Sequence, residues 1–116
     1  MTGLVVDASV AFKWFCAGSR EPLLGEAHDL LDGYTAGRLR IFVPDLFWAE
    51  SANIFWKAVR QGRWKLADAE KAIGELTRLR FSVLASSDLI EDAFAVAAGH
   101  GRTVYDSLYV AAAAAC

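Results

Sequence analysis

The stretch that decides the fold is LVVDAS, at residues 4–9. Three apolar residues in a row that end at an acidic residue are typical of a short strand buried inside a domain. The acidic residue, Asp7, can then cap a short helix over residues 10–15. The chain is therefore expected to begin with a buried strand that passes directly into a helix.

The rest of the chain repeats this alternation of strand and helix. Pro44 ends the second strand, Asp45 is expected to cap the helix after it, and Asp88 with Glu91 resembles a capping pair. Strands separated by helices pair in parallel through right-handed crossovers, so we expect an α/β fold in which helices cover a short parallel sheet. The expected strands are 4–6, 40–43 and 81–84, and the expected helices are 10–15, 23–36, 46–61, 66–79, 88–98 and 103–116.

The composition indicates a globular chain. Its 116 residues suffice for a core, and we expect one domain over residues 1–116. Hydrophobic residues make up 55% and charged residues 22%, which excludes intrinsic disorder. The longest stretch without a charged residue, 107–116, is shorter than the roughly 20 residues that cross a bilayer, and no cationic segment precedes the apolar start. We therefore expect a cytoplasmic protein without a membrane segment.

The net charge and the few cysteine and histidine residues exclude several kinds of binding site. Twelve basic residues against fourteen acidic ones give a net charge of −2, which excludes a globally basic nucleic-acid binder but leaves room for a local basic patch. Cys16 and Cys116 are too few for a disulfide framework, and His28 and His100 are too far apart for a zinc motif. Any metal ion is therefore expected to be a hard ion bound by carboxylates.

Three acidic residues stand where the reacting groups of parallel α/β sheets gather, beyond the carboxyl ends of the strands. Asp7 ends the first strand, Glu50 lies less than two helical turns after the second, and Asp106 is in the first turn of the last helix. Two or three carboxylates with water molecules suit Mg²⁺ or Mn²⁺. Simpler roles stay open, because Asp7 can act only as a helix cap and Asp106 can be the partner of a Thr103 cap. Glu50 has apolar neighbours, and a carboxylate is rarely buried without a partner.

Three motifs occur in an order that is typical of one protein family. They are LVVDAS at 4–9, VPD at 43–45 leading to WAESAN at 48–53, and TVYDSLYVA at 103–111. Together they resemble a PIN domain and, within that family, the VapC-type toxin ribonucleases of bacterial toxin–antitoxin pairs. The resemblance implies a three-layer α/β/α fold and an endoribonuclease that depends on Mg²⁺ or Mn²⁺. By position in the motifs, the implied catalytic residues and metal ligands are Asp7, Glu50 and Asp106, and the supporting residues are Ser9, Asn53 and Ser107.

The same resemblance implies a fourth acidic residue on a further strand after the last helix, whereas this chain ends at Cys116 inside that helix. We therefore expect a sheet that lacks its C-terminal strand or strands, and a site in which three carboxylates hold one ion with water. In the mechanism that the resemblance implies, one ion polarises the scissile phosphate and activates a water molecule, and a second stabilises the leaving oxygen, so the number of ions stays open. The alternative hypothesis is a catalytically silent PIN-like protein that binds an antitoxin or RNA.

Basic residues cluster around Gly62, between two expected helices. With Trp56 and Trp64 interleaved, they suit a flexible RNA, whose phosphates pair with the charges and whose bases stack on the rings. The alternative is a solvated helix end with the tryptophans half in the core. The candidate RNA-binding residues are Lys57, Arg60, Arg63 and Lys65.

The helix expected over residues 46–61 carries more large aromatic residues than one helix face can bury. An exposed subset of them would mark a groove for a partner helix. The family resemblance implies that this partner is a small antitoxin protein, and it also implies a homodimer. The aromatic residues are Phe47, Trp48, Phe55 and Trp56.

Overall fold

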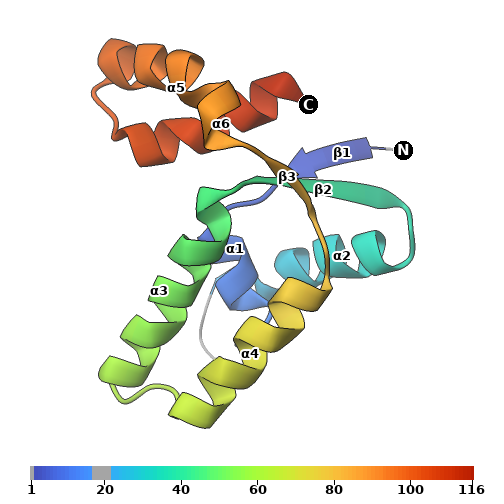
Figure 1. Cartoon of the computed structure of the whole chain (residues 1–116). Coiled ribbons are helices and arrows are strands. Elements are labelled where there is room, and N and C mark those ends of the chain that lie inside the picture. Colours follow the sequence, from blue (N-terminus) through green and yellow to red (C-terminus); the bar gives the residue numbers. More distant parts are fainter. Residues whose placement is uncertain (1, 17–21) are drawn as a thin grey trace.

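The computed structural model describes residues 2–16 and 22–116, and it confirms the expected alternation of strands and helices (Figure 1). None of the helices in these ranges has both the length and the apolar character that a membrane span requires. In chain order the elements are β1 (Thr2–Val5), α1 (Ala8–Lys13), α2 (Leu24–Thr35), β2 (Leu39–Pro44), α3 (Leu46–Arg60), α4 (Leu66–Arg78), β3 (Ser82–Leu84), α5 (Ser86–His100) and α6 (Val104–Ala115).

The strands form one parallel sheet in the order β1-β2-β3, which confirms the α/β fold class. β2 lies in the centre, where Ile41 pairs with Leu4 of β1 and Val43 pairs with Val83 of β3. Because the strands run in the same direction, their carboxyl ends meet at one edge of the sheet. The chain passes from this edge into α1, α3 and α5, so the residues that begin these helices gather there.

Helices cover both faces of the sheet and give the expected three layers (Figure 1). On one face, α1 to α4 pack around a core that includes Ile41 and Phe47. On the other face, the α5–α6 pair forms a second, smaller core that includes Leu89 and Leu108. Successive residues of an extended segment point to opposite faces, and Val6 accordingly joins the first core while Val5 joins the second.

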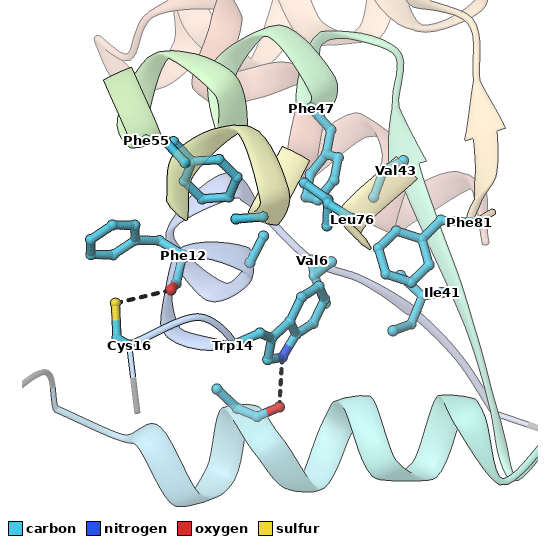
Figure 2. Close-up of a cluster of buried hydrophobic side chains, with 14 of the residues drawn as sticks. Val6, Phe12, Trp14, Cys16, Ile41, Val43, Phe47, Phe55, Leu76 and Phe81 are labelled. Atoms are coloured by element: carbon cyan, nitrogen blue, oxygen red, sulfur yellow. Dashed lines mark hydrogen bonds between the residues drawn. The ribbon is translucent and has the colours of Figure 1, made fainter. Parts of the chain in front are cut away.

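Figure 2 shows the larger of the two cores. Phe47 and Phe55 of α3 are fully buried, because buried positions 47, 51, 55 and 58 recur at helical spacing and form one stripe. The indole Nε1 of Trp14 donates a 2.7 Å hydrogen bond to the backbone oxygen of Ala27, so its polar group is satisfied inside the core. This packing fixes α1 and α3, two of the three helices that begin at the carboxyl edge of the sheet.

The expected cap at Asp88 is wrong, and Asp45 occupies the expected N-cap position of α3 without capping it through its side chain. Asp45 already has helical backbone angles (φ −59°, ψ −24°), and its side chain makes no capping bond to α3. Its carboxylate instead accepts hydrogen bonds from the hydroxyl of Ser86 and, at 2.9 Å, from the Ser86 backbone N–H. These bonds, the hydroxyl's first, hold the pKa of Asp45 below its ordinary value. Since α5 begins at Ser86, Asp88 lies within its first turn and Glu91 further along the helix.

Candidate functional site

The three acidic residues singled out in the sequence line one pocket. It has a volume of about 370 Å³ and draws on the N-terminus of α1, the first half of α3 and the start of α6. The fold therefore brings carboxylates from three distant parts of the sequence to one place. The walls are formed by Asp7, Ala8, Ser9, Glu50, Ile54, Arg102, Asp106, Tyr109 and Val110.

Asp7 is both the N-cap of α1 and part of the pocket wall. Its Oδ1 atom accepts hydrogen bonds from the Ser9 backbone N–H at 3.0 Å, the Ser9 hydroxyl at 2.6 Å and the Val10 backbone N–H at 3.2 Å. The capping role that was left open is therefore present. Within the described ranges Oδ2 accepts no hydrogen bond, so the cap uses only one carboxylate oxygen.

Glu50 lies half-buried on α3, and its partner is the hydroxyl of Tyr109 on α6. That hydroxyl donates a 2.5 Å hydrogen bond to Oε1 of Glu50. Burial of Tyr109, followed by the hydrogen bond and charge of Glu50, raises the pKa of the phenol well above its ordinary value. The charges of Asp7 and Asp106 raise the pKa further, which means that all three carboxylates lie within electrostatic reach of this hydroxyl.

Asp106 is an exposed residue in the first turn of α6. Thr103 caps this helix, a possibility that the sequence left open, and its Oγ1 accepts a 3.1 Å hydrogen bond from the backbone N–H of Asp106. The capping bond thus uses the backbone of Asp106 and leaves its side chain free of that task. In the part of the chain that the structure describes, the Asp106 carboxylate has neither a hydrogen bond nor an ion pair.

The three supporting residues lie in different surroundings. Ser9 lies in the pocket wall and orients Asp7. Asn53 is exposed on α3, one turn after Glu50, but is not part of the wall. Ser107 is fully buried and its hydroxyl donates a 2.8 Å hydrogen bond to the backbone oxygen of Thr103, so it takes part in the packing of α6.

The carboxylates of the pocket are hard oxygen donors, but in this structure they do not lie in the arrangement of metal ligands. Among residues 2–16 and 22–116, no group of three or more His, Cys, Asp or Glu side chains could hold a metal ion in the arrangement observed. Each of the three carboxylates nevertheless keeps at least one oxygen that accepts no hydrogen bond. Because Asp106 is exposed and its carboxylate makes no hydrogen bond in the described ranges, it has room to turn toward the anchored Asp7 and Glu50. This donor set suits Mg²⁺ or Mn²⁺ rather than a softer ion.

Two of the four candidate RNA-binding residues extend from the pocket along α3. Glu50, Lys57 and Arg60 fall on one side of the helix, and Lys57 lies about 10 Å from Glu50 along the axis at ~1.5 Å per residue. Arg63 and Lys65 instead line a second pocket, of about 510 Å³, at the turn between α3 and α4. Two of the four basic residues thus lie along α3, and the other two line the pocket at the turn that follows it.

The two tryptophans near these basic residues have different roles. Trp64 stacks on Phe12 with ring centroids 5.0 Å apart and on Phe55 at 5.2 Å, so it belongs to the edge of the core, as the alternative interpretation expected. The guanidinium of Arg63 lies 5.5 Å from the Phe12 ring centre. Trp56 is 49% exposed and is the tryptophan of this pair that presents its ring to solvent.

Sequence reasoning missed Tyr109 and Arg102, although both form part of the pocket wall. Tyr109 lies three residues after Asp106, so helical spacing places both on one side of α6 and could have pointed to it. Arg102 occupies the turn before α6, where a single basic residue forms no pattern.

Comparison with known proteins identifies a protein family and a relative whose sequences match nearly the whole chain. The family model described as PIN domain matches residues 4–115. Ribonuclease VapC3 of Pyrobaculum aerophilum is 39% identical over 116 residues, in a match that spans 95% of this chain and 80% of that protein.

Proposed function

The chain belongs to the PIN-domain family, and on that premise we propose that it is a metal-dependent endoribonuclease of the VapC type, the toxin of a toxin–antitoxin pair that acts in the cytoplasm. The observation that carries this proposal is the pocket in which Asp7, Glu50 and Asp106 meet. These residues are the proposed catalytic groups, and the substrate is RNA. The reaction is hydrolysis of a phosphodiester bond, in which a water molecule attacks phosphorus in line with the departing oxygen.

The same three carboxylates are the proposed ligands of Mg²⁺ or Mn²⁺, each through an oxygen that the protein leaves unbonded. When bound there, such an ion supplies Lewis-acid polarisation of the phosphate and a nucleophilic water at neutral pH. Together the carboxylates bring three negative charges into a small pocket, so they repel the RNA backbone until cations offset them.

Hydrogen bonds from the protein hold two of the three carboxylates in place. Ser9 and the start of α1 fix one oxygen of Asp7, and Tyr109 fixes one oxygen of Glu50. Groups that orient a ligand in this way raise its affinity, because less freedom is lost on binding. Since the pKa of Tyr109 is raised above its ordinary value, the phenol stays protonated at neutral pH and continues to donate to Glu50.

The proposed RNA path leaves the pocket along α3. Lys57 and Arg60 follow Glu50 on the same side of the helix, and their charges can pair with successive phosphates. Trp56, exposed beside them, can stack on a base. Arg63 and Lys65, in the turn that follows α3, would contact an RNA strand that continues past the end of this helix.

A homodimer is proposed through exposed apolar residues of α5 and α6. Ile90 and Tyr105 line a mostly apolar pocket that these helices form with the start of α3, and Phe94 follows Ile90 by one helical turn. Phe94 is 64% exposed and Tyr105 62%, and with Ile90, which is 42% exposed, they supply the apolar surface that such an interface needs. The proposed antitoxin would act against exposed Trp56 of α3 and the acidic pocket, to which α1, α3 and α6 all contribute.

A catalytically silent PIN-like protein that binds an antitoxin or RNA is the second candidate. It is favoured by the spacing of the acids, because the described side chains include no group that could hold a metal ion as they stand. Both candidate functions include the binding of RNA or an antitoxin, but only the nuclease cleaves RNA.

Cleavage of labelled single-stranded RNA by the antitoxin-free chain, at rising Mn²⁺ and with a chelator as blank, separates the two candidates. The informative variant is Glu50→Gln, whose amide oxygen can still accept from Tyr109, and the matched control is Glu91→Gln on exposed α5. We expect metal-dependent cleavage that falls about a hundredfold or more in Glu50→Gln and is unchanged in Glu91→Gln. RNA binding without cleavage at any Mn²⁺ concentration would favour the silent protein.

A further inference from the structure

Arg102 is a cation in the wall of the acidic pocket that the proposed reaction has not yet used. It lies in the turn between α5 and α6, where Gly101 adopts a left-handed conformation (φ 64°). The backbone N–H of Arg102 donates a 3.2 Å hydrogen bond to the oxygen of Ala97, and Thr103 caps the next helix. The backbone is therefore fixed at this point, while the side chain is exposed.

In the described part of the chain, the guanidinium of Arg102 forms no ion pair with the acidic residues that line the same pocket. No residue in the described part of the chain forms an ion pair with Arg102, although Asp7, Glu50 and Asp106 line the same pocket. An arginine that served only to neutralise these carboxylates would be expected to pair with one of them. Its five donors therefore remain available to a ligand.

We infer that Arg102 binds a phosphate of the RNA strand at the mouth of the acidic pocket; this inference rests on the proposed function. The guanidinium fork matches two phosphate oxygens, and its charge offsets the repulsion between the RNA backbone and the carboxylates. Arg102 is a substrate-binding residue in this account, and it adds to the pocket a positive charge that stays on the protein when no metal ion is bound.

The inference predicts opposite effects on two ligands. Removing the positive charge of Arg102 weakens the binding of RNA, because one phosphate contact is lost. The same change strengthens the binding of a divalent cation, because a like charge beside the carboxylates is removed. A variant that had merely damaged the pocket would bind both ligands more weakly.

The experiment compares Arg102→Ala with the wild type by fluorescence anisotropy of a short single-stranded RNA in Ca²⁺, with a gel to show that the RNA stays intact. The Arg102→Lys variant keeps the positive charge but loses the planar guanidinium that can donate two parallel hydrogen bonds to a phosphate. The matched control is Arg38→Ala, an exposed arginine that precedes β2 at the opposite edge of the sheet. Mn²⁺ alone is then titrated into each variant, and thermal unfolding checks the fold.

We expect Arg102→Ala to lose about five- to tenfold in RNA affinity and to lower the slope of log affinity against log salt by about 0.7, the value for one phosphate of a single strand. The RNA affinity of Arg102→Lys should lie between those of the wild type and Arg102→Ala, and the RNA affinity of Arg38→Ala should equal that of the wild type. Mn²⁺ affinity should rise about two- to fivefold in Arg102→Ala. Unchanged RNA affinity and salt slope in Arg102→Ala, or weaker binding of both ligands, would overturn the inference.

The binding assay also separates this inference from the proposed function. If the wild type binds RNA with the expected dependence on Arg102 but cleaves none at any Mn²⁺ concentration, the nuclease proposal fails and the role of Arg102 stands. If the wild type cleaves RNA and Arg102→Ala binds and cleaves equally well, the nuclease proposal stands and the role of Arg102 fails. If the wild type binds no RNA, both the nuclease proposal and the role of Arg102 fail.

Discussion

The hydroxyl of Tyr109 on α6 donates a 2.5 Å hydrogen bond to Oε1 of Glu50 on α3, across 59 positions of sequence. This bond joins two helices that each contribute an acid to the pocket, since Asp106 precedes Tyr109 on α6. It also gives the half-buried carboxylate of Glu50 the partner that its apolar neighbours require. The integrity of the pocket therefore depends on a phenol that is not itself among the proposed catalytic groups.

Tyr109→Phe should reveal this bond through the pH dependence of stability. Because the pKa of Tyr109 is raised in the folded protein, the unfolded chain releases this proton near pH ~10 while the folded chain retains it. The free energy of unfolding should therefore hold its value below about pH 10 and fall as the pH rises above it. Tyr109→Phe should lose about 1 to 2 kcal/mol at neutral pH and show a shallower decline at alkaline pH.

Urea unfolding at a series of pH values from neutral to alkaline measures both effects. Tyr105→Phe is the control, because Tyr105 is 62% exposed and makes no hydrogen bond within the described ranges. An alkaline decline in Tyr109→Phe as steep as that of the wild type would contradict the assignment.

Two substitutions at Asp7 separate its roles as cap and as pocket acid. Asparagine is as good an N-cap as aspartate, so Asp7→Asn should keep a nearly native thermal midpoint while metal-dependent cleavage is lost. Asp7→Ala removes the cap as well and should lose about 1 kcal/mol of stability in addition. Thermal unfolding and RNA cleavage, measured on the same preparations, check this. If Asp7→Asn cleaves RNA normally, Asp7 is only a cap.

Lys57 and Arg60 should contribute to RNA affinity in a salt-dependent way. Each alanine variant should weaken binding a fewfold and lower the salt slope by about 0.7, because one phosphate contact is lost. Both residues also lie in the last turn of α3, where a positive charge favours the helix end by a few tenths of a kcal/mol at most, so the variants should remain folded. Arg78→Ala, in the last turn of α4, is the control. Salt slopes that do not differ among the variants would remove Lys57 and Arg60 from the RNA path.

Phe94→Ser tests the proposed dimer surface on α5. Since Phe94 is 64% exposed, its replacement should leave the fold intact and shift the protein from dimer to monomer. Leu66→Ser is the control, because Leu66 is 55% exposed but lies on α4 in the opposite layer. Sedimentation equilibrium over a range of concentrations gives the masses. A wild type that is monomeric, or a Phe94→Ser variant that still dimerises, would refute this surface.

Much of this arrangement follows from local sequence pattern. Short apolar runs that alternate with amphipathic segments are sufficient to predict a parallel α/β sheet, and the carboxyl ends of its strands then place Asp7 and Glu50 near each other. The spacing within α3 likewise separates buried Phe55 from exposed Trp56.

The features that sequence did not predict depend on contacts between distant segments. Asp45 has the residue type of a helix cap, but its backbone angles and its bond to Ser86 are set by how β2 and β3 end side by side. Tyr109 acquires its role only when α6 packs beside α3. Arg102 lies in a turn, where no periodicity marks which way a side chain faces.

The measurement that tests the central claim most directly is the binding of Mn²⁺ by the wild type, Asp106→Asn and Asp88→Asn. Asp106 and Asp88 are both exposed acids in the first turn of a helix, so the two variants lose the same interaction with the helix dipole, but only Asp106 lines the pocket. We predict that the wild type and Asp88→Asn bind Mn²⁺ with equal affinity and that Asp106→Asn binds it about tenfold or more weakly. Equal binding by all three proteins, or no binding by the wild type, would contradict a metal-dependent site built from Asp7, Glu50 and Asp106.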